Sequence, residues 1–530
     1  MKRSNNASAT NRKRTAFTVG YRTVAIVAGL SLVSGGLSGA VYAYAQGQAS
    51  GGSSTISQQQ GMQAPGGGGA DTMTFDYSGS YAGAIKADGT KLTSKNESYT
   101  ATETDENAAL VQNGGALTLK CALLQKSGDD TDGDRCNFYG VNSILTAVGE
   151  GSRAYVSDSS LASTSAGSNG IFATDGATVF AYNTSIDTTA DNSRGLDATY
   201  SGTIIADKLD ISTAGDHCAG IATDRGGGSI SVTDTDISTE GSGSPILYST
   251  GDIEVSDLTA TATGSQIAGM EGLNTILIKN STLKSTITAA TASDPVANGV
   301  IIYQSTSGDA EATTGETATF QAVKSTLSSN IQSGSMFYLT NTSANIVLKK
   351  TTLDFDSSKA ALITAEGNDS NNWGQAGSNG ATVTFTGIKQ TLEGNVVADT
   401  ISSIDLYLTK GSTWTGITQI EDNAAGVSTS ESPITVNIDK SSTWVVTGNC
   451  TLSNLNVAKG GKVVDKDGKT VTVVAGGRTV VEGESDITVT VTGSYSTTVT
   501  TASANKLTSD TIDRTAFDKR YKTSTAFSMK

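Results

Sequence analysis

A group of acidic and basic side chains between residues 194 and 225 could act on a polar substrate. The five that could take part in catalysis are Arg194, Asp197, Asp216, Asp224 and Arg225. Paired carboxylates can supply the acid and the base or nucleophile of glycoside hydrolysis. The alternative is structural, because turns favour Asp, Asn and Gly whether or not they carry a function.

Two neighbours of this group limit its chemistry. Asp191 and Asp216 are 25 residues apart. If they stack in a repeat of that length, their like charges repel unless a cation or Arg194 lies between them. His217 is the only histidine, so a Ser-His-Asp triad could use no other base and a histidine-rich zinc site is excluded. We expect His217 to be an exposed turn residue.

A second acidic group suggests a calcium site. Four carboxylates alternate along one glycine-containing loop, at Asp129, Asp130, Asp132 and Asp134. Calcium prefers six to eight oxygen ligands, which such a loop could supply. The EF-hand template fails, however, because Arg135 stands where its Gly belongs and Val141 where its Glu belongs. The alternative is a solvated surface turn, and no other cofactor is suggested.

An internal repeat predicts the elements that carry these residues. One apolar column is formed by Ile171, Leu196, Ile221 and Ile246. A second is formed by Leu161, Ile186, Ile211 and Ile237. The apolar clusters are too short for helices and are separated by Gly, Asn, Asp or Ser. The sequence therefore predicts an all-β fold, a single-stranded right-handed parallel β-helix with about 25 residues per coil, in which equivalent residues stack ~4.8 Å apart.

The repeat restricts the cysteines and places the tryptophans. Cys218 and Cys450 would lie far beyond disulfide reach along the stack, so the one feasible disulfide joins Cys121 to Cys136. Trp373, Trp414 and Trp444 could stack on sugars, although packing in the core or a cap is the expected role. Trp414 and Trp444 end adjacent coils at equivalent positions, which predicts that they are neighbours.

The chain divides into five segments. Residues 1–45 combine a basic stretch with the apolar run Val24–Ala45 and predict an export signal, or an uncleaved anchor as the alternative. Residues 46–70 form a Gly/Ser/Gln-rich linker. We predict an N-terminal cap over 71–100, the β-helix over 101–480 and a Thr-rich C-terminal cap or tail over 481–530.

Charge narrows the choice of partner. The formal net charge is −15, and the first 45 residues contain six Lys and Arg and no acidic residue, so the remainder carries −15 − 6 = −21. Nucleic acids and anionic membranes attract clustered Lys and Arg. We therefore expect no nucleic-acid partner, and contact with a membrane only through an uncleaved N-terminal segment.

The coil endings Lys410-Gly-Ser-Thr-Trp414 and Lys440-Ser-Ser-Thr-Trp444 carry a resemblance to a known family. Over residues 71–480 the chain resembles the pectin-lyase-like superfamily of right-handed parallel β-helices, and within it bacterial adhesin-like surface proteins and autotransporter passengers. In that superfamily, polysaccharide lyases use Asp-held Ca²⁺ with an Arg or Lys base. No catalytic motif of the family matches this sequence residue by residue.

Three functions remain open. The favoured one is an exported, monomeric, non-catalytic adhesin-like protein, extracellular or at the cell surface, that presents its coils to glycans or surface proteins of a host or the environment. The first alternative is a polysaccharide lyase or glycoside hydrolase. The second is a structural or ice-binding-type polar face, which is disfavoured because Ser interrupts the Thr column.

Overall fold

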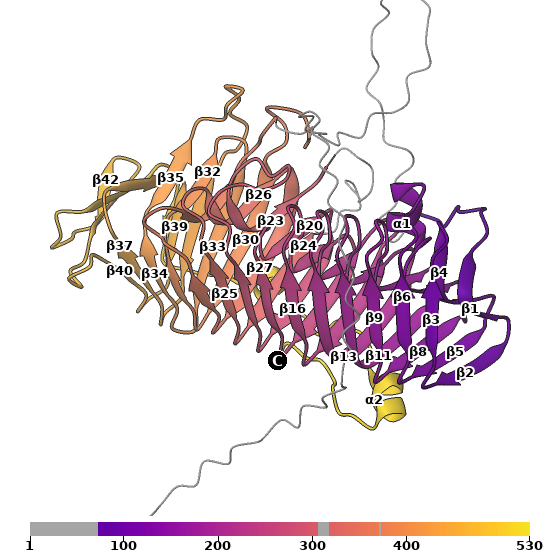
Figure 1. The fold of residues 1–530 in the computed structure, drawn as a ribbon. Coiled ribbons are helices and arrows are strands. Elements are labelled where there is room, and N and C mark those ends of the chain that lie inside the picture. The colour runs from indigo at the N-terminus through magenta and orange to yellow at the C-terminus, as the bar shows by residue number, and fades with distance from the viewer. Residues whose placement is uncertain (1–72, 306–316, 370–372) are drawn as a thin grey trace, which may run out of the picture. The chain divides into compact units, whose positions relative to one another are not determined.

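The computed structural model describes residues 73–305, 317–369 and 373–530, which are built almost entirely from short parallel strands (Figure 1). Contacts divide the chain into units 1–53 and 54–530, and the described residues belong to the second. The predicted export signal over 1–45 and linker over 46–70 lie outside the described residues. Within the described ranges, no helix is long and apolar enough to span a bilayer.

One strand of each coil belongs to a 13-stranded parallel sheet, which we name sheet A. Its strands, in order, are β1 (Ala82–Asp88), β4 (Glu106–Gln112), β7 (Leu145–Val148), β10 (Ile171–Thr174), β12 (Leu196–Ala198), β14 (Ile221–Thr223), β17 (Leu247–Ser249), β20 (Ala268–Glu271), β23 (Asn298–Tyr303), β26 (Ser335–Thr340), β29 (Ala361–Ala365), β32 (Val396–Asp399) and β35 (Thr418–Glu421). Sequence neighbours in this sheet are one coil apart, as a solenoid requires.

The other two strands of each coil form sheet B, whose two strand rows meet at a turn that we name the corner turn. The first row contains β2 (Lys91–Lys95), β5 (Ala116–Lys120), β8 (Arg153–Ser157), β11 (Thr178–Thr188), β13 (Gly202–Thr213), β15 (Gly228–Thr233), β18 (Asp252–Ser256), β21 (Thr275–Lys279), β24 (Ala318–Val323), β27 (Thr342–Lys349), β30 (Ala381–Ile388), β33 (Ser403–Thr409), β36 (Ile434–Ile438), β39 (Asn454–Val457) and β44 (Tyr495–Ser496). Strands β11 and β13 continue through the corner turn into the second row.

The second row contains β3 (Ser98–Ala101), β6 (Leu123–Lys126), β9 (Ser160–Ser163), β16 (Asp236–Thr239), β19 (Thr259–Ala262), β22 (Thr282–Ser285), β25 (Thr326–Ser329) and β28 (Thr352–Asp354). Next along the chain comes a four-stranded sheet of β31 (Thr391–Glu393), β34 (Thr413–Gly416), β37 (Thr443–Val446) and β40 (Lys462–Val464). The predicted parallel β-helix is therefore confirmed.

The predicted columns hold with one exception. Ile171, Leu196 and Ile221 are partners in register, as are the members of the second column. The fourth member of the first column is Leu247, not Ile246, because the coil from Ile221 to its partner has 26 residues. Ile246 is still buried in the same core. A fixed stride of 25 therefore fails wherever a coil gains a residue.

Close packing between coils explains a glycine column that the repeat contains. A Cβ on Gly170 would lie 2.5 Å from the carbonyl oxygen of Gly195, and one on Gly195 would lie 2.5 Å from that of Gly220. These distances are shorter than real Cβ contacts, so a side chain would force adjacent coils apart. The inward side chains of the coils form one long apolar cluster.

Both predicted cap boundaries need correction. Strands β1, β2 and β3 pair in parallel with β4, β5 and β6, so residues 82–101 already form a coil. At the other end, β38 (Cys450–Leu452), β43 (Thr488–Val491), β41 (Thr472–Ala475) and β42 (Arg478–Val481) form a final four-stranded sheet. The pair β41–β42 is antiparallel, which departs from the coil pattern and covers one strand edge.

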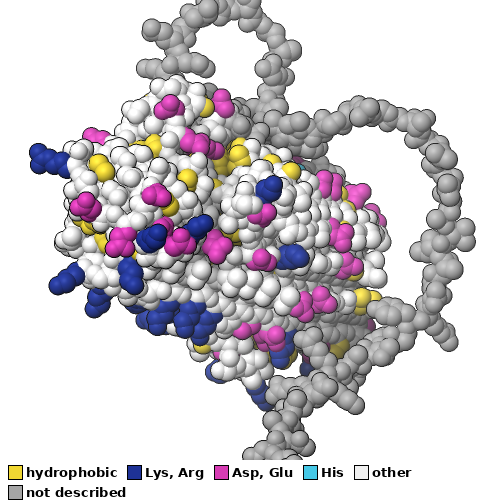
Figure 2. Space-filling view, turned by 90° about the vertical axis from the view of Figure 1, so that its left-hand side faces the viewer, with side chains coloured by type: hydrophobic (Ala, Val, Ile, Leu, Met, Phe, Trp, Pro, Cys, Tyr) yellow, Lys and Arg dark blue, Asp and Glu magenta, His cyan; other side chains and the backbone are white. Residues whose placement is uncertain are grey.

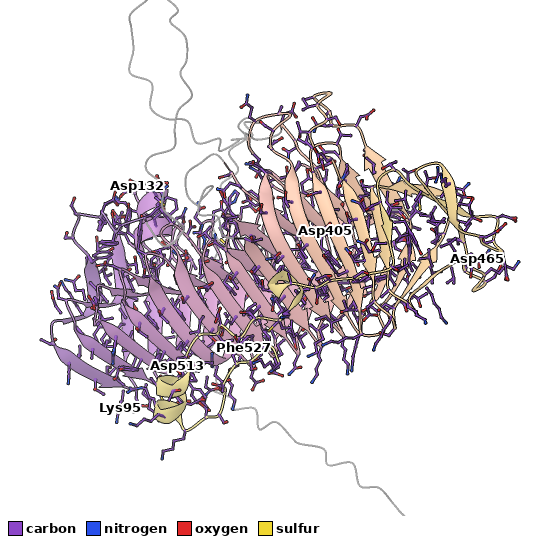
Figure 3. All side chains as sticks on the ribbon, turned by 180° about the vertical axis from the view of Figure 1, so that it is seen from behind. Lys95, Asp132, Asp405, Asp465, Asp513 and Phe527 are labelled. Carbon is purple, nitrogen blue, oxygen red and sulfur yellow. The ribbon has the colours of Figure 1, made fainter. Side chains whose placement is uncertain are left out.

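Residues 503–530, which we name the C-terminal strap, do not cap the stack. They contain the 3₁₀-helix η3 (Ser503–Asn505) and helix α2 (Thr515–Tyr521), and they lie along the outer face of sheet B (Figure 3). Asn505 contacts Thr386, whereas Phe517 packs against Phe180, many coils nearer the N-terminus. The predicted C-terminal cap over 481–530 is therefore wrong beyond the final sheet.

Candidate functional site

The predicted charged group forms a partly buried cluster on the outer face of sheet A. Arg194 lies at the turn before β12, and its Nε is 3.6 Å from Oδ2 of Asp197 on that strand. Its Nη2 is 3.0 Å from Oδ2 of Asp224, which follows β14 in the next coil. The guanidinium also donates to Asn137 of helix α1 (Gly133–Tyr139) at 2.6 Å. The structure thus brings together three of the five predicted catalytic residues.

Burial controls the electrostatics of this cluster. Asp197 is fully buried, and burial raises its pKa well above the ordinary value even though Arg194 favours the charged form. Burial also opposes the charge on Arg194, but Asp197 and Asp224 outweigh it and raise the pKa of the guanidinium. Arg194 therefore remains charged and is committed to its two carboxylate neighbours.

The other two predicted catalytic residues lie apart from this pair of contacts. Asp216 is exposed at another turn, where its Oδ1 accepts from the amide of Ser242 at 2.8 Å. Its own amide donates to Oδ1 of Asp191 at 2.9 Å, so backbone amides, rather than a cation, offset the predicted repulsion between these stacked carboxylates. Arg225 lies over the ring of Phe138, 3.7 Å from the centroid. His217 is an exposed turn residue, as predicted.

A second polar cluster on sheet A was missed by the sequence analysis. Oε2 of Glu271 accepts from the hydroxyls of Tyr248 at 2.8 Å and Tyr303 at 3.2 Å. The hydroxyl of Ser305 donates to Oε1. The ring of Tyr303 stacks on Trp373, with 4.4 Å between the ring centroids. Glu271 is buried, so this carboxylate is surrounded by hydroxyl donors rather than by solvent.

The sequence offered a weak signal for this second cluster. Glu271 and Tyr303 are partners in register on β20 and β23, but 32 residues separate them. The regular stride of 25 does not connect them, because the intervening segment includes a long excursion. Counting from the Ile-Leu-Ile-Lys pattern of the next strand, rather than from a fixed stride, would have placed Glu271 at a strand end.

The predicted calcium ligands do not converge. Oδ1 of Asp129 accepts from the amide of Ala166 at 3.0 Å, and Asp132 caps helix α1 by accepting from the amide of Asp134 at 3.1 Å. Asp130 lies beside Gly167. No group of three or more His, Cys, Asp or Glu side chains suited to a metal occurs among the described residues. The loop is better explained as a helix start than as a cation site.

The predicted disulfide is also wrong. All four cysteines are described, and all four are free. Cys121 is exposed at the corner turn between β5 and β6, whereas Cys136 is buried within helix α1, so the two thiols lie on different parts of the coil. Burial raises the pKa of the Cys136 thiol above its ordinary value, which disfavours the reactive thiolate.

The tryptophans serve the interior. Trp414 and Trp444 stack with 4.8 Å between ring centroids, which confirms that they are neighbours. Both are fully buried, and their indole N–H groups donate to the carbonyls of Gly394 and Gly416. Trp373 is 6% exposed. Contact of Trp414 or Trp444 with a sugar is therefore contradicted by their burial.

A cavity of about 640 Å³ lies between the strap and sheet B. Gln321 on its wall donates to the carbonyl of Lys506 at 3.1 Å and accepts from the amide of Thr508 at 2.9 Å. Glu254 accepts from the amide of Ile512 at 2.6 Å. These wall side chains are thus used to hold the strap in place.

Comparison with known proteins adds little beyond the fold. No protein-family model and no curated protein matches the sequence. Among solved structures, a chain of the cryo-EM structure of the Vag8–C1 inhibitor complex aligns with 78% of this chain and 100% of that chain, at 12% sequence identity and a TM-score of 0.36. A likeness at that level carries no inference about binding or activity.

Proposed function

We propose that this protein is an exported, non-catalytic binding protein that presents its β-helical coils at the cell surface or in the surrounding medium. The observation that carries the proposal is the state of the carboxylates on sheet A. Asp197 and Asp224 are held by Arg194, and Glu271 accepts from three hydroxyl groups. A glycosidase needs two carboxyl groups that face a bound sugar, one of which can transfer a proton.

Buried, internally bonded carboxylates serve packing better than catalysis. Asp197 has no exposed surface, and Asp224 and Glu271 are each 5% exposed. A substrate would have to displace the arginine or the tyrosine hydroxyls before it could reach these oxygens, which would leave buried charges without partners. Lyase and hydrolase activity, the first alternative, is therefore disfavoured by the same geometry.

The experiment uses the full chain in two assays. A polysaccharide panel is scored for new reducing ends and for unsaturated products, and a glycan and protein array is scored for retention. We expect retention without product. Product that is formed by the native protein, and lost in Asp197→Ala and Asp216→Ala variants that remain folded, would replace the binding proposal with the enzymatic one.

A further inference from the structure

The corner turn of sheet B carries one exposed lysine in each of six successive coils. These lysines are Lys324, Lys350, Lys389, Lys410, Lys440 and Lys459. Their equivalence follows from the registers, since Val323 pairs with Lys349, Ile388 pairs with both Lys349 and Thr409, and Ile438 pairs with Leu408 and Val457. We name this row the lysine ladder.

The backbone holds the ladder in register. Lys324, Lys350, Lys389 and Lys410 each have a positive φ between 52° and 56°, the left-handed conformation that this turn requires. The residue after each of them bonds to the next coil: the amide of Gln390 donates to Oγ of Ser412 at 3.0 Å, and that of Ser412 donates to Oγ of Ser442 at 3.1 Å. The spacing of the lysines is therefore fixed near ~4.8 Å.

The ladder is accompanied by a row of hydroxyl groups. Three residues beyond each corner turn, Thr352 pairs with Thr326, Thr413 pairs with Thr391, and Thr443 pairs with Thr413. All of these threonines are at least partly exposed. A ligand on the ladder would thus meet both a line of positive charges and a parallel line of hydrogen-bonding groups.

No acidic partner neutralises the ladder. Of the salt bridges in the described part of the chain, none involves these six lysines. Six charges at this spacing span about 24 Å, and each interval is shorter than the Debye length of ~8 Å at physiological ionic strength. They therefore act as one continuous positive stripe on a protein of net charge −15. Figure 2, which faces the C-terminal coils, shows Lys and Arg side chains gathered in one compact group.

We infer that the lysine ladder binds a linear anionic polysaccharide with sulfate or carboxylate groups. The stripe is one residue wide, and exposed Asp354 and Glu393 lie beside it in the second strand row. A flat anionic membrane or a nucleic-acid duplex would also meet these carboxylates, whereas a single polysaccharide chain need not. Sugar hydroxyls can also bond to the threonine row. The inference rests on the proposed binding function and names its ligand class.

The test measures binding of the full chain to immobilised heparin across a series of salt concentrations, with neutral dextran as the uncharged reference. The variant Lys350→Gln, Lys389→Gln and Lys410→Gln removes three central charges. We expect affinity to fall about threefold to a hundredfold at low ionic strength, with a weaker salt dependence, because exposed charge pairs contribute modestly and are screened. Circular dichroism checks that the coils persist.

A matched control removes three exposed lysines from the N-terminal coils, Lys91→Gln, Lys95→Gln and Lys120→Gln, and changes the net charge equally. We expect it to bind heparin as the native protein does. Equal losses in both triple variants, unchanged binding in the ladder variant, or tighter binding to duplex DNA would each overturn the inference. Retention of dextran alone would overturn it while leaving the binding function intact, whereas cleavage of a polysaccharide would overturn the binding function itself.

Discussion

The two outer faces of this β-helix bury carboxylates in different ways. On sheet A, Asp197 and Asp224 are paired with Arg194, which lies three residues before one of them in the chain. On sheet B, Glu254 and Asp207 lie beneath the strap, whose Arg514 comes from the C-terminus and donates to the carbonyls of Ser231 and Ala206 at 2.6 and 2.8 Å. The comparison teaches that a stacked acidic residue tolerates burial where a cation is supplied, whether locally or from a remote segment.

The largest effect is expected on sheet A. Arg194→Met leaves two buried carboxylates without their cation and should destabilise the protein by about 3–5 kcal/mol. Chemical denaturation, followed by circular dichroism, measures the change. Replacing both acids with Asn in the same chain should restore much of the loss, because the uncompensated charges are then gone.

Arg478→Met is the control for that variant, since Arg478 is an exposed residue of β42. Its unfolding free energy should remain within about 0.5 kcal/mol of the native value. An Arg194→Met protein as stable as this control would break the comparison, because burial of the acids on sheet A would then need no arginine.

The second effect is expected on sheet B and should be local. Arg514 is 2% exposed, and Arg514→Met removes its bonds to two backbone carbonyls. We expect docking of the strap to weaken by about 3 kcal/mol, while the coils, which contact mainly their neighbours, stay folded. Hydrogen exchange should rise over residues 503–530. The exposed neighbour Lys519 gives the control, Lys519→Met, which should leave exchange unchanged.

How far sequence predicts these two faces follows from the distance between partners. The stride of 25 placed Arg194, Asp197 and Asp224 near one another, because they lie in two consecutive regular coils. No periodic pattern links Arg514 to Ser231, since the strap lies outside the repeat and runs against its direction. Glu271 was missed for a related reason, because coils of unequal length shift every later position.

The misplaced disulfide and calcium site show a different limit. The segment 129–136 contains residue types that suit both, and composition alone could not reveal that helix α1 begins there. Asp132 is used as the helix cap and Cys136 as a buried helical residue. Local secondary structure thus fixed the roles of these side chains, whereas the repeat, which predicted the coils well, said nothing about the loops between them.

A third and smaller effect concerns pH and sharpens the comparison on the sheet B side. Burial raises the pKa of Glu254 from 4.5 to about 7, although the Ile512 amide, Ser231 and Arg514 favour its charged form and Asp252 opposes it. Burial raises the pKa of Asp207 as well. The docked strap therefore binds the proton more tightly than the free state. The resulting stabilisation is full below pH 4.5 and is lost as the pH rises through about 7.

The shift of about 2.5 units limits this contribution to roughly 3 kcal/mol, since one pKa unit corresponds to about 1.4 kcal/mol. Hydrogen exchange of residues 503–530, corrected for the intrinsic pH dependence, should show weaker protection at pH 8 than at pH 5. Glu254→Gln should remove most of that difference. A strap equally protected at both pH values in the native protein would contradict the assignment of Glu254 as the titrating group.

The smallest effect tests whether exposed cations on the strap matter as the buried one does. The guanidinium of Arg520 lies 3.5 Å from the centroid of the Tyr155 ring on β8, yet Arg520 is exposed. Cation–π contacts at exposed sites contribute about 0.5–1 kcal/mol, so Arg520→Ala should raise hydrogen exchange in helix α2 only slightly. A loss as large as that of Arg514→Met would mean that the aromatic contacts of helix α2, rather than a buried cation, hold the strap on sheet B.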